Sequence, residues 1–139
     1  MASFVKFHPF VEALAEKRHN LGSDTLKVLL SNTAPSQANA VKGDITEITP
    51  GNGYTAGGHA LTVTSSAQSG GTYKLVANDL TITAAGGSIG PFRYAVLYND
   101  TDTLDGLIGY WDYGSAISLA DTETFTLDLS ATNGVLQLT

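Results

Sequence analysis

The feature that most constrains the fold is a succession of short β-type segments from about residue 60 to the end of the sequence. Each segment alternates apolar and polar residues or is rich in β-branched and aromatic residues, and turn residues separate it from the next. Many short strands joined by turns favour a mainly β fold, an antiparallel β-sandwich or jelly roll of about eight or nine strands. The expected strands are 25–30, 60–64, 72–76, 79–83, 92–98, 107–113, 116–119, 123–129 and 135–138.

Between these strands the sequence predicts breaks at 65–71 and 86–91. Asn133 and Gly134 form the best two-residue hairpin signal in the chain. With 139 residues, the whole chain (1–139) is expected to be one domain.

One short helix is expected ahead of the strands, over about residues 9–19. Pro9 suits a first helical position because the N–H it lacks would be unpaired there. Phe10 and Leu14 lie on one face of this helix, and Gly22 is a natural stop beyond it. The apolar stripe must be buried either against the domain itself or against a partner, and the sequence leaves both open.

A long irregular segment, residues 32–58, follows the first strand. Connections longer than about 12–15 residues are uncommon unless they are functional or partly structured. Residues 44–48 are expected to form one helical turn, with Ile45 and Ile48 as anchors. We therefore expect this segment to be the main contact surface of the chain.

Composition excludes several classes of protein. The chain has no cysteine, so it has no disulfide, thiol nucleophile or cysteine-ligated metal site. No apolar run approaches the ~18 residues that span a membrane, and the N-terminal residues lack a secretion-signal core. With 13 acidic and 7 basic residues, sequence-independent binding of nucleic acid is not expected. We expect the protein to be made in the cytoplasm and to bind neither membrane nor nucleic acid.

The charges are unevenly distributed along the chain. Residues 1–74 carry six basic and five acidic residues, whereas residues 75–139 carry one basic and eight acidic residues. One interpretation is a solvated acidic face that keeps the protein soluble. The other is a polar molecule, whose near-neutral N-terminal half docks while the acidic half faces outward.

No group of residues predicts catalysis. His8 and His19 flank the helix and His59 is expected in a loop, so surface or capping roles are favoured over a shared metal site. Asp112 and Asp128 lie on expected strands, but nothing in the sequence brings them together as a glycosidase pair. We expect no enzyme activity, no cofactor and no metal.

Two further clusters admit two interpretations each. Asp100, Asp102 and Asp105 precede Gly106, which fits either a solvated hairpin turn or a weak calcium site with imperfect spacing. Aromatic side chains gather on two adjacent strands, and they fit either a sandwich core with tyrosines at an interface or a sugar-stacking platform. These aromatic residues are Tyr94, Tyr98, Tyr110, Trp111 and Tyr113.

Several motifs together resemble a family of small structural proteins encoded among the virion genes of tailed bacteriophages. These are FVEALAE (10–16) with HNLG (19–22), LLSNTAP (29–35), DITEI (44–48), GNGYTAGG (51–58), GPFRYAVLYND (90–100) and GYWDYG (109–114). The resemblance covers nearly the whole chain and carries no catalytic motif. It implies a virion component, most simply a capsid decoration or cement protein that binds the major capsid protein.

A cement role implies contacts with capsid subunits at a symmetry axis, for which a homotrimer is the simplest match. We expect the helix and residues 32–58 to make these contacts, while the acidic strands face solvent. The candidate interface residues are Phe10, Val11, Leu14, Arg18, Ile45, Ile48 and Tyr54. Two alternatives remain: a tail or fibre component that binds a host glycan through the aromatic strands, and a cell-wall hydrolase that uses Asp112.

Overall fold

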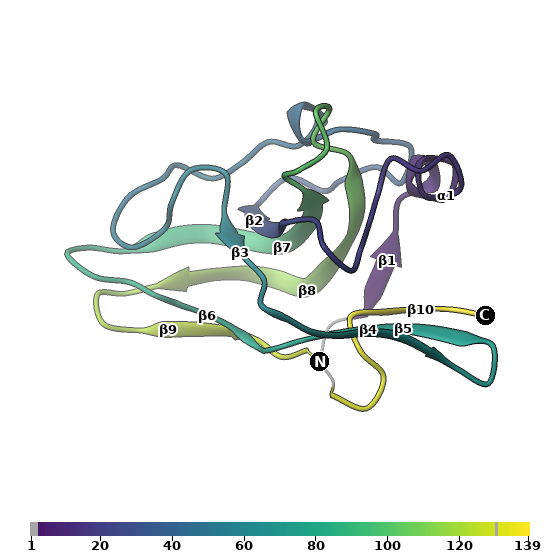
Figure 1. Ribbon diagram of the computed structural model, residues 1–139. Coiled ribbons are helices and arrows are strands. Elements are labelled where there is room, and N and C mark those ends of the chain that lie inside the picture. The colour runs from purple at the N-terminus through teal and green to yellow at the C-terminus, as the bar shows by residue number, and fades with distance from the viewer. Residues whose placement is uncertain (1–2, 130) are drawn as a thin grey trace.

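The computed structural model describes residues 3–129 and 131–139, and the chain is mainly β in these residues (Figure 1). They form ten strands, one α-helix and one 3-10 helix. The elements are β1 (Phe4–Lys6), α1 (His8–Ala15), β2 (Leu26–Ser31), η1 (Lys42–Asp44), β3 (His59–Ala60), β4 (Val63–Ser69), β5 (Thr72–Ala77), β6 (Leu80–Thr83), β7 (Ile89–Asn99), β8 (Leu107–Leu119), β9 (Thr124–Leu127) and β10 (Leu136–Leu138).

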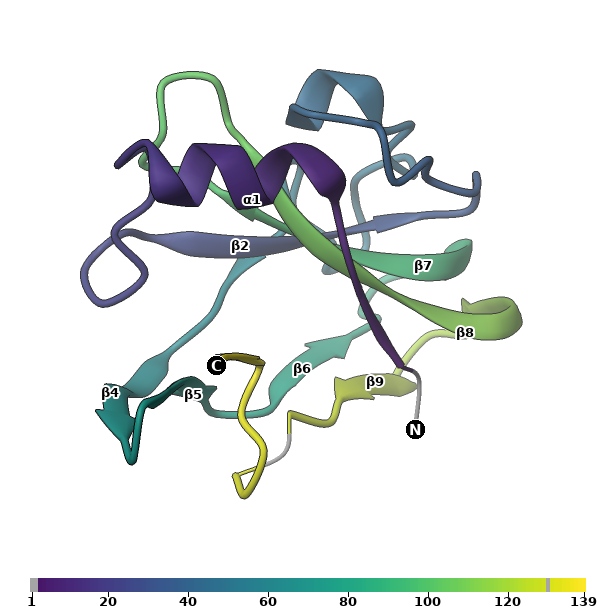
Figure 2. The same cartoon turned by 90° about the vertical axis from the view of Figure 1, so that its right-hand side faces the viewer.

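The strands form two layers, which confirms the expected sandwich-like fold with one short helix. One layer is a five-stranded antiparallel sheet in the order β1-β8-β7-β2-β3. The other contains the sheet β10-β5-β4 and the ribbon β6-β9 (Figure 2). The core joins side chains of both layers in one hydrophobic cluster that includes Leu29, Leu75 and Phe125. The helix α1 lies across the outer side of the five-stranded sheet (Figure 2).

The longest strands are β7 and β8, which pair as the centre of the fold. Two sequence predictions fail here. The segments 107–113 and 116–119 are one continuous strand, β8, and the expected turn at 86–91 ends early because β7 already begins at Ile89. In both cases the pairing of β7 with β8 resumes beyond the turn-prone residues, with shifts of register between Ile89 and Phe92 and between Phe92 and Tyr94.

The observed pairing corrects two more turn predictions, the first of them only in part, because Gly70 and Gly71 do form a turn. The serine-rich segment expected as a break at 65–71 is most of β4, which pairs with β5 across Gly70 and Gly71. Asn133 and Gly134 do not close a hairpin, because β9 pairs with β6 whereas β10 pairs with β5. They lie instead where the chain crosses from one sheet of the second layer to the other.

The helix is shorter than expected and ends at Ala15. Lys17 adopts a left-handed conformation with φ 71°. The N–H of Arg18 then donates to the Ala13 carbonyl oxygen at 2.9 Å, and that of Lys17 to Leu14 at 3.3 Å. This paired return is a Schellman motif, so Lys17 rather than Gly22 ends the helix. Pro9 does lie in the first turn, as predicted.

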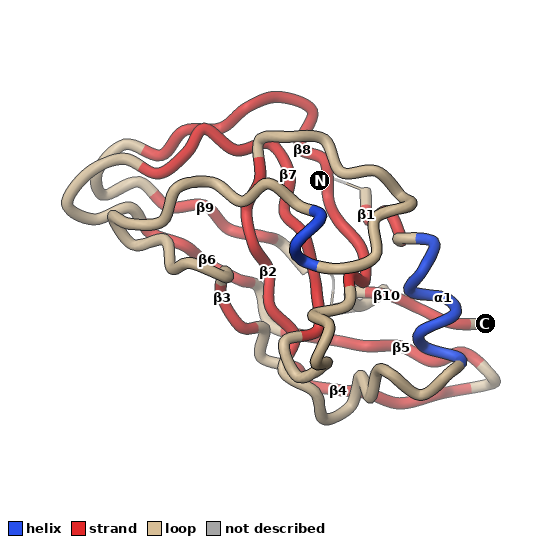
Figure 3. Tube along the Cα trace, turned by 90° about the horizontal axis from the view of Figure 1, so that it is seen from above, coloured by secondary structure: helices blue, strands red, loops and turns tan. Residues whose placement is uncertain are grey.

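Residues 32–58 pack along the five-stranded sheet (Figure 3). The helical turn predicted over 44–48 is found slightly earlier, as η1. Ile45 and Ile48 are partly buried against the core, which confirms them as anchors. The N–H of Ile48 also donates to the Leu30 carbonyl oxygen at 3.0 Å, so this segment continues the sheet beyond β2. No helix in the described residues is long and apolar enough to cross a membrane.

Candidate functional site

The helix α1 buries one side and leaves another open. Phe10 and Ala13 are buried in the domain, Leu14 is half-buried, and Val11 remains 51% exposed. Most of the apolar stripe is therefore buried against the domain itself, and Val11 stays exposed. Phe10 and Ala13 face the core, while Leu14 reaches a hollow at the surface.

Two neighbouring hollows lie between α1 and the second layer, and we call them together the docking groove. The larger, of about 460 Å³, is lined by Leu14, Lys17, His19, Leu21, Tyr73 and Leu138, among others. The smaller, of about 190 Å³, is lined by Phe4, Lys6, Phe10, Leu136, Gln137 and Leu138. Leu138 lines both hollows, so they adjoin. Figure 2 looks onto this side of the molecule, with α1 above and β10, β5 and β4 below.

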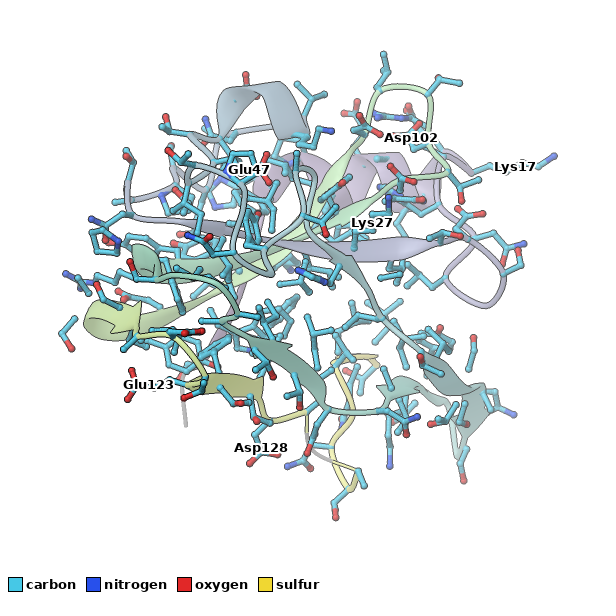
Figure 4. All side chains as sticks on the ribbon, turned by 90° about the vertical axis from the view of Figure 1, so that its left-hand side faces the viewer. Lys17, Lys27, Glu47, Asp102, Glu123 and Asp128 are labelled. Carbon is cyan, nitrogen blue, oxygen red and sulfur yellow. The ribbon has the colours of Figure 1, made fainter. Side chains whose placement is uncertain are left out.

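The docking groove is apolar and its fully charged residues are basic. Lys6 and Lys17 are exposed at it, and none of the described residues that line either hollow is acidic. Figure 4 shows Lys17 projecting from the body of the molecule. The chain as a whole has a net charge of −6, so this surface is unlike the average surface of the protein. Such a surface favours a ligand that brings both apolar and acidic groups.

One end of the docking groove is supported by a buried polar cluster around Asn99. The Asn99 side-chain amide donates to His19 Nδ1 at 2.9 Å and to Asp24 Oδ2 at 2.7 Å. Its carbonyl oxygen accepts from the N–H groups of Thr101 and Asp102. Because Nδ1 accepts, the ring proton is on Nε2, which is buried and has no hydrogen-bond partner.

Burial favours the neutral form of the His19 ring. Burial lowers the pKa of the His19 ring; Asp102 and Asp24 oppose that shift and Arg18 adds to it. His19 is only 6% exposed, so its expected surface or capping role was wrong. His8 is exposed, as expected. His59 lies in β3 rather than in a loop, half-buried against the Tyr54 ring.

The acidic turn after β7 is a set of ion pairs. Asp102 contacts Arg18 at 2.6 Å, and the pairs Lys27–Asp100 and Lys42–Asp105 close at 3.3 and 3.7 Å. Each carboxylate faces a different cation, and the described residues contain no group of three or more metal-ligating side chains. The hairpin interpretation is therefore favoured over a calcium site.

The same ion pairs contradict the interpretation of a near-neutral N-terminal half beside a separate acidic C-terminal half. Three of the basic residues from the N-terminal half, Arg18, Lys27 and Lys42, pair with aspartates of the C-terminal half. A neutral docking half and an acidic outward half do not exist as separate regions. Of the lysines outside these ion pairs, Lys6 and Lys17 lie at the docking groove, and Lys74 lines a separate polar hollow beside β4 and β5.

The aromatic strands form core rather than a platform. Tyr94, Tyr98 and Trp111 are at most 7% exposed. Tyr113 packs on the Phe125 ring at 5.2 Å between centroids, and Tyr110 packs on Phe7. This confirms the core interpretation and removes the sugar-stacking surface on which the glycan-binding alternative depended.

The carboxylates proposed for a hydrolase are separated. The Asp112 carboxylate accepts two hydrogen bonds from Arg93, at 2.8 and 3.1 Å, and Arg93 holds the pKa of that carboxyl below its ordinary value. Asp128 lies in the other layer, after β9 (Figure 4). They do not face one another as a catalytic pair.

Two of the seven candidate interface residues are interior. Phe10 and Tyr54 are each 2% exposed, so neither offers more than marginal area to a partner, although Phe10 lines the smaller hollow. The Tyr54 hydroxyl donates to Glu47 Oε2 and accepts from the Leu30 N–H, which ties residues 47–54 to β2. Burial and this acidic neighbour raise the pKa of Tyr54. Leu14, Arg18, Ile45 and Ile48 are half-buried, and Val11 is exposed.

The sequence analysis missed the second side of the docking groove. Leu136 and Leu138 were assigned to a closing strand, and nothing in their spacing indicates that β10 would approach α1. β1 was not predicted at all, although the pattern Phe4-Val5-Lys6 is compatible with a short strand. No family model, curated protein or solved structure matches this chain.

Proposed function

We propose that this protein is a bacteriophage virion structural protein of the capsid-decoration type, which binds the major capsid protein and stabilises the shell. The observation that carries the proposal is the docking groove, an apolar and basic surface on an otherwise acidic domain. The resemblance of the sequence motifs to phage virion proteins supplies the identity of the partner. The protein would be made in the host cytoplasm and would reside on the capsid surface.

The fold suits attachment better than turnover. The strongest polar clusters, at Asn99 and at Glu47, hold loops to the sheet and have their hydrogen bonds within the domain. Three large hydrophobic side chains of the described residues remain exposed: Leu138 at the groove, Val11 on α1 and Leu104 in the turn after β7. Such a rigid domain can present one adhesive surface many times over a shell, where weak contacts add through multivalency. A trimer would match a three-fold position on that shell.

The test is co-sedimentation with capsids of the phage that encodes the chain, after the native copies have been stripped. Leu138→Asp should abolish or strongly weaken binding, because it places a carboxylate in the docking groove, where Leu138 lines both hollows. Leu104→Asp is the matched control, since Leu104 is 57% exposed in the turn after β7 and lines neither hollow. Equal binding by the two variants, or loss with Leu104→Asp alone, would overturn the proposal.

A further inference from the structure

We infer that the docking groove binds an extended segment of a partner protein as an added β-strand, with apolar side chains toward the hollows and carboxylates toward Lys6 and Lys17. The inference deepens the proposed function and depends on it only for the identity of the partner. The segment is specified here by its chemistry.

The first support is the position of two sheet edges. In the described residues β10 is the outer strand of its three-stranded sheet and β1 is the outer strand of the five-stranded sheet. Both contribute residues to the smaller hollow, which therefore lies where the two layers are open. The Gln37 side chain donates to the Lys6 carbonyl oxygen at 3.0 Å and so covers part of β1. The edge of β10 is the more open template for main-chain hydrogen bonds, which supply affinity in strand addition.

The second support is the shape beside that edge. Alternate side chains of an extended segment point to the same face and repeat at about 6.6–6.8 Å. A strand beside β10 would present one set of side chains between the two layers, where Phe4, Phe10 and Leu136 line the smaller hollow. Leu138, 37% exposed, continues this apolar surface into the larger hollow beside Leu14. Apolar side chains at alternate positions would cover both.

The third support is charge. Lys6 belongs to the smaller hollow and Lys17 to the larger one, so both parts carry a cation and neither carries an acid among its described lining residues. Neither lysine takes part in the ion pairs described above, unlike Lys27 and Lys42. Carboxylates on the partner would complement both lysines, and lysines on the partner would be repelled.

The edge strand β4 of a second copy fits the docking groove less well. The most exposed edge strand of the chain is β4, in which six of the seven residues are exposed. Its sequence, VTSSAQS, contains no carboxylate for the lysines and only one large apolar side chain for the hollows. A segment of another protein that alternates apolar and acidic residues meets both requirements.

The inference can be tested on the full chain without knowing the partner. The probes are two synthetic peptides with identical valines at alternate positions, one with glutamates and the other with lysines between them. Each is titrated into the ¹⁵N-labelled protein at low salt while amide shifts are followed. The glutamate peptide should shift amides of β1, α1, residues 17–22 and β10, and the lysine peptide should bind roughly tenfold more weakly or not at all.

A charge-reversed variant provides the matched control. The double substitution Lys6→Glu and Lys17→Glu should exchange the preference, so that the lysine peptide now binds at the same amides. Leu138→Asp should weaken binding of the glutamate peptide, whereas Leu104→Asp should leave it unchanged. Unchanged preference in the double variant, or shifts centred on the polar hollow of about 440 Å³ beside Ser65, Ser69 and Lys74, would refute the inference.

The capsid and peptide experiments can refute the proposed function and the strand-addition site independently of each other. Binding of the glutamate peptide at the groove without binding to capsids would leave the strand-addition site standing and reject the capsid as the partner. Capsid binding that is insensitive to the double substitution would retain the decoration role and reject this site.

Discussion

Replacement of Asn99 by alanine should destabilise the protein more than any other single change in its polar residues. Asn99 is fully buried at the end of β7, and its side chain joins His19, Asp24 and the following turn. Alanine removes the hydrogen bonds that the Asn99 amide donates to His19 and Asp24, and also those that its side-chain oxygen accepts from the turn. It also leaves His19 Nδ1 buried without a donor, and the Nε2 side of that ring already has no partner.

The magnitude follows from counting what is left unpaired. A buried acceptor without a donor costs about 1–3 kcal/mol, and each lost hydrogen bond whose groups can reach water costs about 0.5–1.5 kcal/mol. The His19 nitrogen belongs to the first class, and the turn N–H groups and Asp24 lie nearer the surface and belong to the second. The expected loss is about 2–4 kcal/mol of unfolding free energy, which for a chain of this length lowers Tm by roughly 10 °C.

Urea denaturation and calorimetry of Asn99→Ala measure this directly, with Asn78→Ala as the control. Asn78 is exposed after β5, so its substitution should change the unfolding free energy by less than about 0.5 kcal/mol. If Asn99→Ala is as mild as the control, the Asn99 cluster does not organise this end of the fold and the reasoning is refuted.

The variant Asn99→Asp tests the same cluster through pH. In the parent protein the folded-state pKa of His19 lies below 6.5, so its contribution to stability is complete above that pH and is lost as pH falls through the folded value. A carboxylate at position 99 would instead favour the charged ring and raise its pKa. Relative to the parent, Asn99→Asp should therefore gain stability as pH falls from 7.5 to 5.5, and a relative loss over that range would contradict the assigned contact.

Three further outcomes are expected. Gly58→Ala should lower the unfolding free energy by about 3 kcal/mol or more, because φ is +87° and a Cβ would lie 2.0 Å from a β2 carbonyl oxygen. The control Gly114→Ala has a similar φ of +83° but no heavy atom within 4 Å of the added Cβ. It should lower the unfolding free energy by only about 1–2 kcal/mol, measured for both variants by chemical denaturation. Tyr54→Phe should cost about 1–3 kcal/mol by the same assay, because it strands a buried N–H of β2. Burial alone would raise the pKa of Asp102, but hydrogen bonds, chiefly from Arg18, hold that pKa below 3.8. The resulting stabilisation of the folded state is complete above pH 3.8 and is lost as the pH falls further. Arg18→Gln should therefore raise the midpoint pH of acid unfolding, which circular dichroism measures.

The alternating pattern was enough to predict the layers of this fold, since burial on one face leaves a direct signature at every second residue. The pattern was not sufficient to predict which strands pair with each other. The Asn133-Gly134 pair has the local chemistry of a hairpin, yet β10 joins β5, about sixty residues earlier. Likewise, β4 is a serine-rich strand without an apolar face, so only its backbone pairing with β5 defines it.

The site was partly predictable for a different reason. Leu14 followed from helical spacing, which is local information. Phe10 and Tyr54 were misassigned because an apolar side chain in a helix or loop has the same sequence signal whether it faces a core or a partner. His19 was missed because its burial depends on Asn99, eighty positions away.

The ion pairs of the turn after β7 explain why the docking groove can be basic in an acidic protein. Asp100, Asp102 and Asp105, in the turn after β7, are each paired with a cation from the N-terminal half. This neutralisation reduces the negative field beside α1, while Asp79, Asp121, Glu123 and Asp128 lie along β6 and β9 in the other layer. Charges separated by more than a Debye length of about 8 Å are largely screened at physiological salt, so the local lysines rather than the net charge govern what approaches the groove. Reversing Lys6 and Lys17 should therefore alter recognition far more than an equal change of net charge made on β9.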